Sequence, residues 1–234
     1  MYSAVFCKVY NEFGWNCYPE AFGEELLQWI CQTGASIKSA MDLGCGTGIL
    51  CDILSRSGIR ASGTDLSESM IAVAKENFPN LDFAAADMIT FRPVEQFDLV
   101  TCTGDALNHI LTLENVHAIF ENVFSYLASG GYFIFDILNE QEVSACEPFD
   151  CPFSDSIRAE FQIIKGENGL INLKTRVFED GQFRFEENIY EILHDPAIIR
   201  ELLEKTGFRD IRISDRLTED GNKSTTWYVV AQKP

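Results

Sequence analysis

Strand-like and helix-like segments alternate through the first 140 residues of this 234-residue chain, and no other feature constrains its fold as strongly. This alternation is typical of a parallel sheet with helices on both faces, because parallel strands need crossover connections. The expected strands are Ser39–Leu43, Arg60–Thr64, Leu81–Ala85, Asp98–Thr103 and Gly131–Ile137. The expected helices are Ala21–Thr33, Ile49–Ser57, Ser67–Asn77 and Leu113–Leu127.

The pattern changes after residue 156. Three β-rich runs separated by turn signals predict an antiparallel meander: Ile157–Lys165, Leu170–Glu179 and Phe183–Leu193. Sheet-type segments then resume with a helix at Pro196–Thr206 and strands at Phe208–Ser214 and Ser224–Ala231. The meander is therefore expected to be an insert in one α/β domain, and residues 140–156 are expected to be a connecting loop.

The charge balance narrows the partners. With 18 basic and 36 acidic residues, the chain has a net charge of −18. Nucleic acids and anionic membrane surfaces are bound by clustered Lys and Arg, so we expect neither as a partner. No signal peptide is evident, and the longest apolar run, Tyr132–Leu138, is far shorter than the roughly 20 residues that cross a bilayer. We expect a soluble, cytoplasmic protein.

The cysteines indicate a reducing compartment and no metal site. Eight cysteines in a chain of this length are too dilute for a disulfide framework. The chain has no C-x-x-C pair and three histidines, so a zinc site is not expected.

The most informative segment is an apolar strand that runs into Gly44, Gly46 and Gly48 and then into a helix. Glycines at such a turn let a ligand approach the backbone, and ligands of open α/β sheets bind at the carboxyl ends of the strands. About 20 residues downstream, at the end of the next strand, a carboxylate at Asp65 suits the two hydroxyls of a ribose. The spacing is G-x-G-x-G and Asp42 precedes it, which favours a ligand with an ammonium and a sulfonium over the pyrophosphate of NAD.

These residues resemble the class I S-adenosylmethionine-dependent methyltransferases. The resemblance rests on five motifs in the family's order, residues 41–48, 63–67, 85–88, 97–104 and 127–136. It implies a Rossmann-like, doubly wound, mostly parallel seven-stranded sheet, closed by the last two strands. It also implies one methyltransferase domain over residues 1–234, with a helical cover at 1–35, a cofactor-binding core at 36–140, a β-meander lid over the acceptor pocket at 157–193, and a closing helix and strands at 194–234.

The implied cofactor is S-adenosyl-L-methionine, with S-adenosyl-L-homocysteine as product. The glycines are expected to admit its methionine part, Asp65 its ribose, and Asp87 and Met88 its adenine, with Met70 on the other face of the ring. Met70 as an ordinary core residue is the alternative. The full set of expected cofactor residues is Tyr10, Tyr18, Asp42, Gly44, Cys45, Gly46, Gly48, Asp65, Leu66, Met70, Asp87, Met88 and Thr103.

His109 is the candidate catalytic residue. It follows the fourth strand, and an imidazole has the pKa of a general base at neutral pH. The segment is similar to that of a small-molecule subgroup that includes bacterial aminosugar N,N-dimethyltransferases, in which a matching histidine is implicated as base. The alternative is that His109 only lines the pocket. Tyr10 and Tyr18 resemble the aromatic N-terminal segment that covers the cofactor in this subgroup, although Asn11 departs from its Tyr-Asp pattern.

The expected function is methyl transfer to N or O of a small molecule by in-line displacement, in a monomer or homodimer. An NAD-dependent oxidoreductase is the second hypothesis, and a non-catalytic S-adenosylmethionine-binding protein the third. Methylation of RNA is disfavoured by the acidic charge and by the lack of an Asn-Pro-Pro-Tyr segment.

Overall fold

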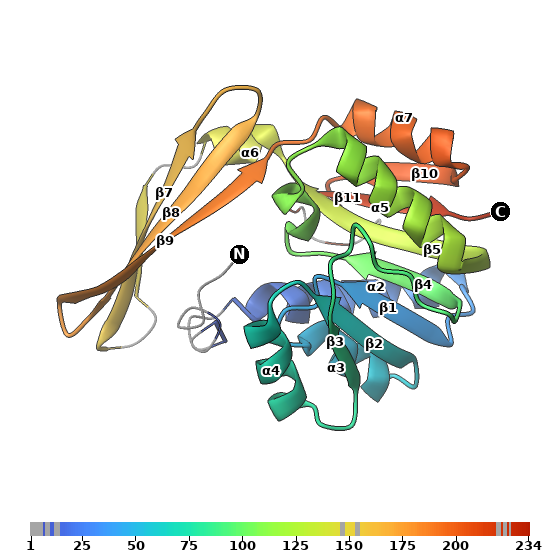
Figure 1. The fold of residues 1–234 in the computed structure, drawn as a ribbon, viewed down its shortest axis with the longest axis horizontal. Helices are drawn as coiled ribbons and strands as arrows, with labels where there is room; N and C mark the ends of the chain where they lie inside the picture. The colour runs from blue at the N-terminus through green and yellow to red at the C-terminus, as the bar shows by residue number, and fades with distance from the viewer. Residues whose placement is uncertain are drawn as a thin grey trace.

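The computed structural model describes residues 7, 10–11, 15–145, 148–152, 155–218, 221, 224 and 226–234. It consists of a seven-stranded sheet flanked by helices and a separate four-stranded sheet that projects from it (Figure 1). The mixed α/β architecture predicted from the alternating pattern is confirmed.

The large sheet has the strand order β10-β11-β5-β4-β1-β2-β3. Its strands are β1 (Ser39–Leu43), β2 (Arg60–Asp65), β3 (Asp82–Ala85), β4 (Phe97–Cys102), β5 (Leu127–Leu138), β10 (Arg209–Ser214) and β11 (Thr226–Gln232). Pairing is parallel from β3 to β5 and antiparallel at β11 and β10. The sheet is therefore the mostly parallel one that was expected, and the carboxyl ends of β1, β2 and β4 meet at one edge.

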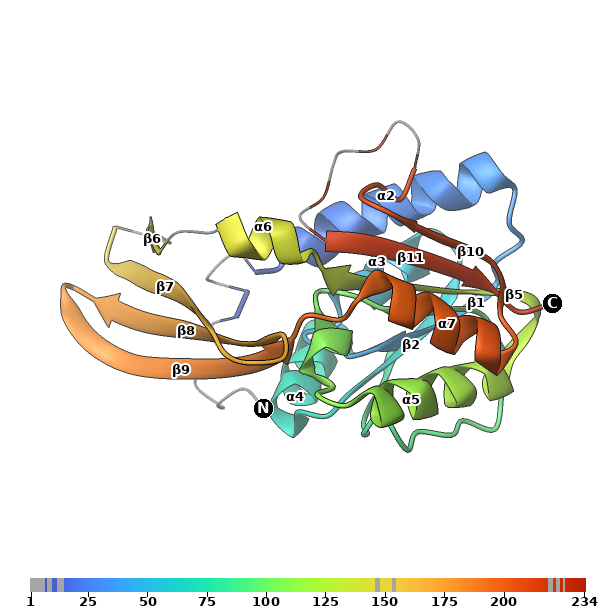
Figure 2. The same cartoon turned by 90° about the horizontal axis from the view of Figure 1, so that it is seen from above.

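Helices cover both faces of this sheet. Their bounds are α2 (Cys17–Thr33), α3 (Ile49–Arg56), α4 (Glu68–Asn77), α5 (Leu113–Tyr126) and α7 (Pro196–Thr206). Side chains of α2, α3 and α4 pack into one buried cluster and those of α5 and α7 into another, because successive residues of a strand face opposite sides. Figure 2 shows α2 on one side of the strands and α5 and α7 on the other.

Side-chain caps begin three of these helices. The Ser67 hydroxyl accepts from the amide of Met70 at the start of α4, and the Thr112 hydroxyl accepts from Asn115 at the start of α5. Asp195 does the same for α7, which has Pro196 as its first residue. Side-chain oxygens at these positions satisfy amides that have no partner within the helix.

The four-stranded antiparallel sheet has the order β6-β7-β8-β9, and we call it the lid. Its strands are β6 (Phe149–Pro152), β7 (Ile157–Lys165), β8 (Leu170–Glu179) and β9 (Gln182–Ile192). The three-stranded meander is confirmed, but the prediction that residues 140–156 form only a loop is wrong. They include helix α6 (Glu140–Ala145) and β6, a strand of four residues that exists through its pairing with β7.

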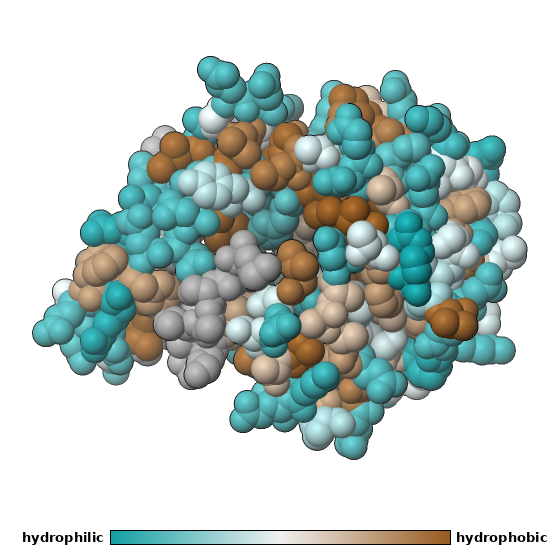
Figure 3. All heavy atoms as spheres, viewed as in Figure 1, coloured by the Kyte–Doolittle hydropathy of each residue, from teal (hydrophilic) through white to brown (hydrophobic). Residues whose placement is uncertain are grey.

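The lid meets the large sheet at the edge where the glycine-rich segment lies. The visible face of the molecule is mainly hydrophilic, and apolar side chains gather along the seam between lid and core (Figure 3). Within the described part of the chain, no helix is long and apolar enough to span a membrane.

Candidate active site

The glycine-rich loop runs from the end of β1 into α3, and it is hydrogen-bonded to the end of β2. The amides of Gly44 and Cys45 donate to the Thr64 carbonyl at 2.7 and 2.9 Å. Gly44, Gly46 and Gly48 all have positive φ, at 72°, 51° and 85°, which L side chains adopt only with strain. The sharp turn predicted from the glycine spacing is therefore present.

The three glycines differ in what surrounds them. A Cβ at Gly44 would lie 2.8 Å from the Ala106 Cβ, and one at Gly48 would lie 2.6 Å from the Phe83 ring. A Cβ at Gly46 would meet nothing within 4 Å. Gly44 and Gly48 thus permit close packing, while the backbone at Gly46 borders open space where a ligand can approach.

Asp65, at the end of β2, holds this loop in shape. One carboxylate oxygen accepts from the Gly46 amide at 2.9 Å, and the other accepts from the Ser67 amide at 2.8 Å. Burial raises the pKa of Asp65, and these two hydrogen bonds oppose the rise. Its carboxylate keeps further lone pairs for a ligand, and the neighbouring Leu66 side chain is exposed.

The predicted adenine segment lies beside the same loop. The Asp87 carboxylate accepts from the amide of Ile89 at 2.9 Å, so it is fixed by its own turn. The Met88 methyl group lies 3.5 Å from the position of a Cβ on Gly44. Asp87 and Met88 are both half-buried, as is Thr103 at the end of β4. These residues therefore lie at the same edge of the sheet as the glycine-rich loop, and their contact with a cofactor stays a prediction.

Asp42 is buried beneath the loop. Thr101 on β4 donates its hydroxyl proton to the Asp42 carboxylate at 2.6 Å. Burial raises the pKa of Asp42 to about 7, against the lowering effect of this hydrogen bond. A nearby positive charge would stabilise the ionised form of this buried acid. This is consistent with the role expected for Asp42 beside the ammonium group of the cofactor.

Two predicted residues pack into apolar clusters. Met70 is almost fully buried against Cys7 and Ile189, which agrees with the core alternative. The Cys45 side chain is buried against Gly63 of β2. Contact of either residue with a cofactor stays a prediction.

The N-terminal segment contacts both the glycine-rich loop and β5. The Tyr18 hydroxyl donates to the buried Asp136 carboxylate on β5. The Tyr10 ring lies 5.4 Å, centroid to centroid, from Trp15. The Thr47 hydroxyl donates to the Asn11 side-chain carbonyl at 2.9 Å, which gives a structural role to the residue that departs from the subgroup pattern. The cofactor contacts predicted for the two tyrosines stay predictions.

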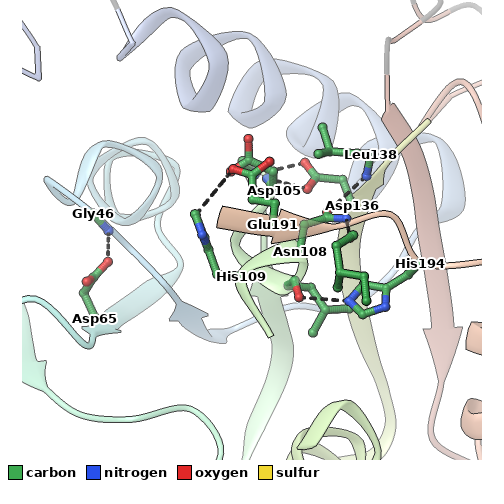
Figure 4. A network of polar contacts seen from close by, with 12 residues as sticks. Gly46, Asp65, Asp105, Asn108, His109, Asp136, Leu138, Glu191 and His194 are labelled. Atoms are coloured by element: carbon green, nitrogen blue, oxygen red, sulfur yellow. Dashed lines mark hydrogen bonds and ion pairs between the residues drawn. The ribbon is translucent and has the colours of Figure 1, made fainter. Parts of the chain in front are cut away.

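His109 ends the short 3-10 helix η1 (Ala106–His109), which begins with the residue that packs on Gly44. Its Nε2 lies 3.8 Å from an oxygen of Asp105 and 3.8 Å from an oxygen of Glu191 on β9. In Figure 4 the ring points toward these two carboxylates, with the Gly46–Asp65 pair on its other side. The His109 side chain is 31% exposed and that of Glu191 is 4% exposed, so the cluster is open on the imidazole side and closed behind Glu191.

Burial sets the charge states of this cluster. It lowers the pKa of His109, although a hydrogen bond to the Tyr190 backbone acts in the opposite direction. It raises the pKa of Glu191, and burial together with the charges of Glu191 and Asp136 raises that of Asp105. A lowered pKa favours the neutral imidazole, which is the form that can accept a proton.

Two buried residues fix η1 in place. The Asn108 side chain donates to the Ile192 carbonyl at 2.7 Å and accepts from the Leu138 amide at 3.1 Å. The His194 Nε2 lies 3.2 Å from the Leu107 carbonyl. The lid strand and β5 are thus both bonded to the segment that carries His109.

Four of these residues were not predicted from the sequence: Asp105, Asp136, Glu191 and His194. Asp136 interrupts an apolar strand, and Glu191 follows the inward-facing Ile189 at strand spacing. For these two residues the available sequence signal was a polar side chain at a strand position where the alternating pattern calls for an apolar one. Asp105 gave no such signal, because it lies in a polar loop.

Residues 40–131 match the model of the methyltransferase domain family. The chain is 27% identical to a protein of Bacillus subtilis (strain 168) that has the provisional name methyltransferase YqeM, over 97% of this chain and 96% of that protein. Among solved structures, an S-adenosylmethionine-dependent methyltransferase from Clostridium acetobutylicum has a TM-score of 0.80 at 22% identity, covering 92% of this chain and 91% of that one. The sugar N-methyltransferase KedS8 from Streptoalloteichus has a TM-score of 0.76 at 16% identity, covering 91% and 87%. These structural likenesses establish the Rossmann-like fold.

Proposed function

We propose that this chain, an S-adenosylmethionine-dependent methyltransferase, transfers the methyl group to a nitrogen or oxygen of a small molecule, with His109 as general base. The observation that carries the proposal is the position of His109. Its partly exposed, neutral imidazole follows β4 at the carboxyl edge of the sheet, and the 3-10 helix that bears it packs on the glycine-rich loop.

The residues at the loop fit the cofactor. The open space beside the Gly46 backbone admits a ligand, and the half-buried Asp65 carboxylate next to it suits a ribose. Asp42 and the segment with Asp87 and Met88 would hold the ammonium and adenine ends, respectively. When bound, S-adenosylmethionine supplies an electrophilic methyl group on a positively charged sulfur.

The protein's own contribution is positioning and proton removal. Holding two reactants in line can supply about 7–11 kcal/mol of a barrier without covalent help from the protein. The neutral His109 Nε2 can take the proton that an attacking amine or hydroxyl loses. The lid over this edge excludes water and provides the surfaces that select the acceptor.

Several features favour a small acceptor. The lid stands over the same edge of the sheet as His109, and its last strand supplies Glu191 to the site. The net charge of −18 disfavours polyanions. The fold is shared with a sugar N-methyltransferase, an enzyme that acts on small molecules. We propose one domain over the chain, acting as a monomer or homodimer.

A thermal-shift titration tests this proposal. S-adenosylhomocysteine at 100 times its dissociation constant adds about 2.7 kcal/mol to the free energy of unfolding, so the melting temperature rises. NADH serves as the control ligand. A shift with NADH and none with S-adenosylhomocysteine or S-adenosylmethionine would contradict the proposal. A screen of amines, aminosugars and hydroxylated aromatics for S-adenosylhomocysteine formation then identifies the acceptor.

A further inference from the structure

The lid contributes a buried acid to the candidate active site. Glu191 lies on β9, far in sequence from the methyltransferase segments, and its side chain is 4% exposed. No hydrogen bond to its carboxylate is found among the described residues, and the His109 Nε2 at 3.8 Å is too distant for one. A buried carboxylate without such a bond is costly, because burial removes its hydration.

Asp105 turns a second carboxylate toward the same point. Asp105 has a positive φ of 57°. Its backbone amide donates to the Asp136 carboxylate at 2.9 Å, which maintains this conformation. The ligand atoms of Asp105, His109 and Glu191 all lie within 4.8 Å of one another. Within the described ranges, neither carboxylate has a Lys or Arg nitrogen within 4 Å. Among the described residues, the cluster thus combines two acids and a neutral imidazole without a Lys or Arg partner.

We propose that Asp105, His109 and Glu191 form the site that binds the methyl acceptor as an ammonium ion. This inference rests on the proposed function and narrows it from nitrogen or oxygen to nitrogen. Three hydrogen-bond acceptors converge, and a primary ammonium brings three N–H donors, whereas a hydroxyl brings one. The positive charge also supplies a countercharge, which lowers the cost of ionising the buried Glu191 and the half-buried Asp105.

The spacing of the three atoms suits this group. The His109 Nε2 lies 3.8 Å from an oxygen of each carboxylate, and a nitrogen out of the plane of the three atoms can reach all of them at the roughly 2.7–3.2 Å of an N–H hydrogen bond. Zn²⁺ and Mg²⁺ take bonds of about 2.0–2.1 Å, and the test below separates these ions from an ammonium ion. Ca²⁺ has longer bonds but takes about six to eight oxygen ligands, more than this cluster offers.

The same cluster can also remove the proton that the bound ammonium must lose before methyl transfer. The bound ammonium transfers one proton to the His109 Nε2, and the electron pair of that N–H bond stays on nitrogen. This pair forms the new N–C bond while the S–C bond breaks and its electron pair stays on sulfur. The methylated nitrogen is again positively charged, and the two carboxylates 3.8 Å from His109 stabilise the imidazolium formed. Glu191 and Asp105 bind the acceptor directly, so both are predicted to be substrate-binding residues.

A titration of histidine resonances tests the proposal without the natural acceptor. The protein is labelled with ¹³C-histidine and saturated with S-adenosylhomocysteine, and the His109→Gln variant identifies the His109 resonance. Methylammonium chloride is the probe, tetramethylammonium chloride, which has no N–H, is the reference, and NaCl keeps the ionic strength constant. Glu191→Gln and Asp105→Asn are compared with Glu186→Gln, a change on the outer face of the same strand where Glu186 pairs with Lys174.

We expect methylammonium to shift the His109 resonance saturably in the wild type and in Glu186→Gln. The apparent affinity should fall at least tenfold in Glu191→Gln and in Asp105→Asn, and tetramethylammonium should bind at least tenfold more weakly. Equal responses to both ions, or an unchanged response in Glu191→Gln, would overturn the inference.

Two further outcomes are separable. If Zn²⁺ or Mg²⁺ shifts the resonance, EDTA reverses it, Glu191→Gln abolishes it and methylammonium has no effect, the cluster is a metal site and the inference is wrong. If S-adenosylhomocysteine does not raise the melting temperature of the wild type, the proposed function itself fails. Retention of that thermal shift in each variant shows that the variant is folded and still binds the cofactor product.

Discussion

The side-chain amide of Asn108 joins the 3-10 helix of the candidate active site to Ile192 at the end of the lid. Its nitrogen donates to the Ile192 carbonyl at 2.7 Å, and its oxygen accepts from the Leu138 amide at 3.1 Å. The residue is fully buried. One side chain therefore sets the distance between the lid strand, the large sheet and the neighbouring His109.

We expect Asn108→Ala to destabilise the protein by about 1–3 kcal/mol, because a buried carbonyl and a buried amide lose their partner. This corresponds to a fall in melting temperature of roughly 2–4 °C per kcal/mol for a protein of this size. Asn188→Ala, on the exposed face of β9, is the control and should stay within about 0.5 kcal/mol of the wild type. Urea denaturation measures both, and equal losses would refute a special role for Asn108.

A second prediction concerns Asp42 and pH. Burial raises its pKa to about 7 in the folded protein, against about 3.9 in an unfolded chain. The folded state then binds the proton more tightly, so this contribution to stability is present at low pH and is lost as pH rises from about 4 through about 7. Asp42→Asn removes the dependence and keeps an oxygen to accept from Thr101.

Denaturation at pH 5 and pH 8 checks the sign. Between these values the wild type should lose roughly 1–3 kcal/mol relative to Asp42→Asn. Asp98→Asn is less suitable as a control, since its carboxylate accepts from Ser39. The exposed Asp82→Asn is preferable and should show the wild-type dependence. Parallel pH profiles for wild type and Asp42→Asn would contradict the prediction.

A third prediction compares two glycines of similar backbone conformation. Gly44 and Gly34 have φ values of 72° and 67°, so alanine is strained at both, by about 1–2 kcal/mol. At Gly34 a new Cβ meets nothing within 4 Å, but at Gly44 it lies 2.8 Å from the Ala106 Cβ. Gly44→Ala should therefore cost more than Gly34→Ala.

Gly44→Ala should also weaken S-adenosylhomocysteine binding, since it displaces the start of the helix that carries His109. Gly34→Ala should leave the affinity unchanged, because Gly34 only ends α2. Calorimetric titration of both variants measures the difference, and equal affinities would mean that the loop tolerates the extra methyl group.

A fourth prediction concerns Asp65. Its carboxylate shapes the loop through the amides of Gly46 and Ser67 and is proposed to bind the ribose. We expect Asp65→Ala to reduce S-adenosylhomocysteine affinity at least 100-fold, while the exposed Asp82→Ala retains it. Calorimetry decides this, and full affinity in Asp65→Ala would remove the residue from the site.

Much of the large sheet was predictable because its signals are local. The bounds of β1 and α7 agree with the prediction, since each is set by neighbouring residues such as the glycine after Leu43 and the cap at Asp195. The glycine turn and the place of Asp65 follow from the same short-range pattern. Strand β6 was missed because only its pairing with β7 makes it a strand.

The acidic part of the candidate site could not be predicted in this way. Glu191 and His109 are separated by 82 residues, so the distance between them depends on how the lid docks on η1. The sequence indicates an ordinary turn residue at His194, yet the structure shows it buried and bonded to the Leu107 carbonyl. Contacts between an insert and a core depend on the path of the whole chain.

The last prediction separates the catalytic role of His109 from its alternative as a lining residue. If its Nε2 takes the acceptor's proton, His109→Ala should slow methyl transfer about 10²–10⁴-fold and leave S-adenosylhomocysteine affinity unchanged. His117→Ala is the matched control. It lies on α5, and its buried Nε2 has no hydrogen-bond partner among the described residues, so its removal leaves no group unpaired there. Single-turnover measurements with an acceptor found by screening separate binding from transfer. A rate in His109→Ala within twofold of the wild type would leave His109 as a lining residue, because a general base cannot be replaced by a methyl group without loss.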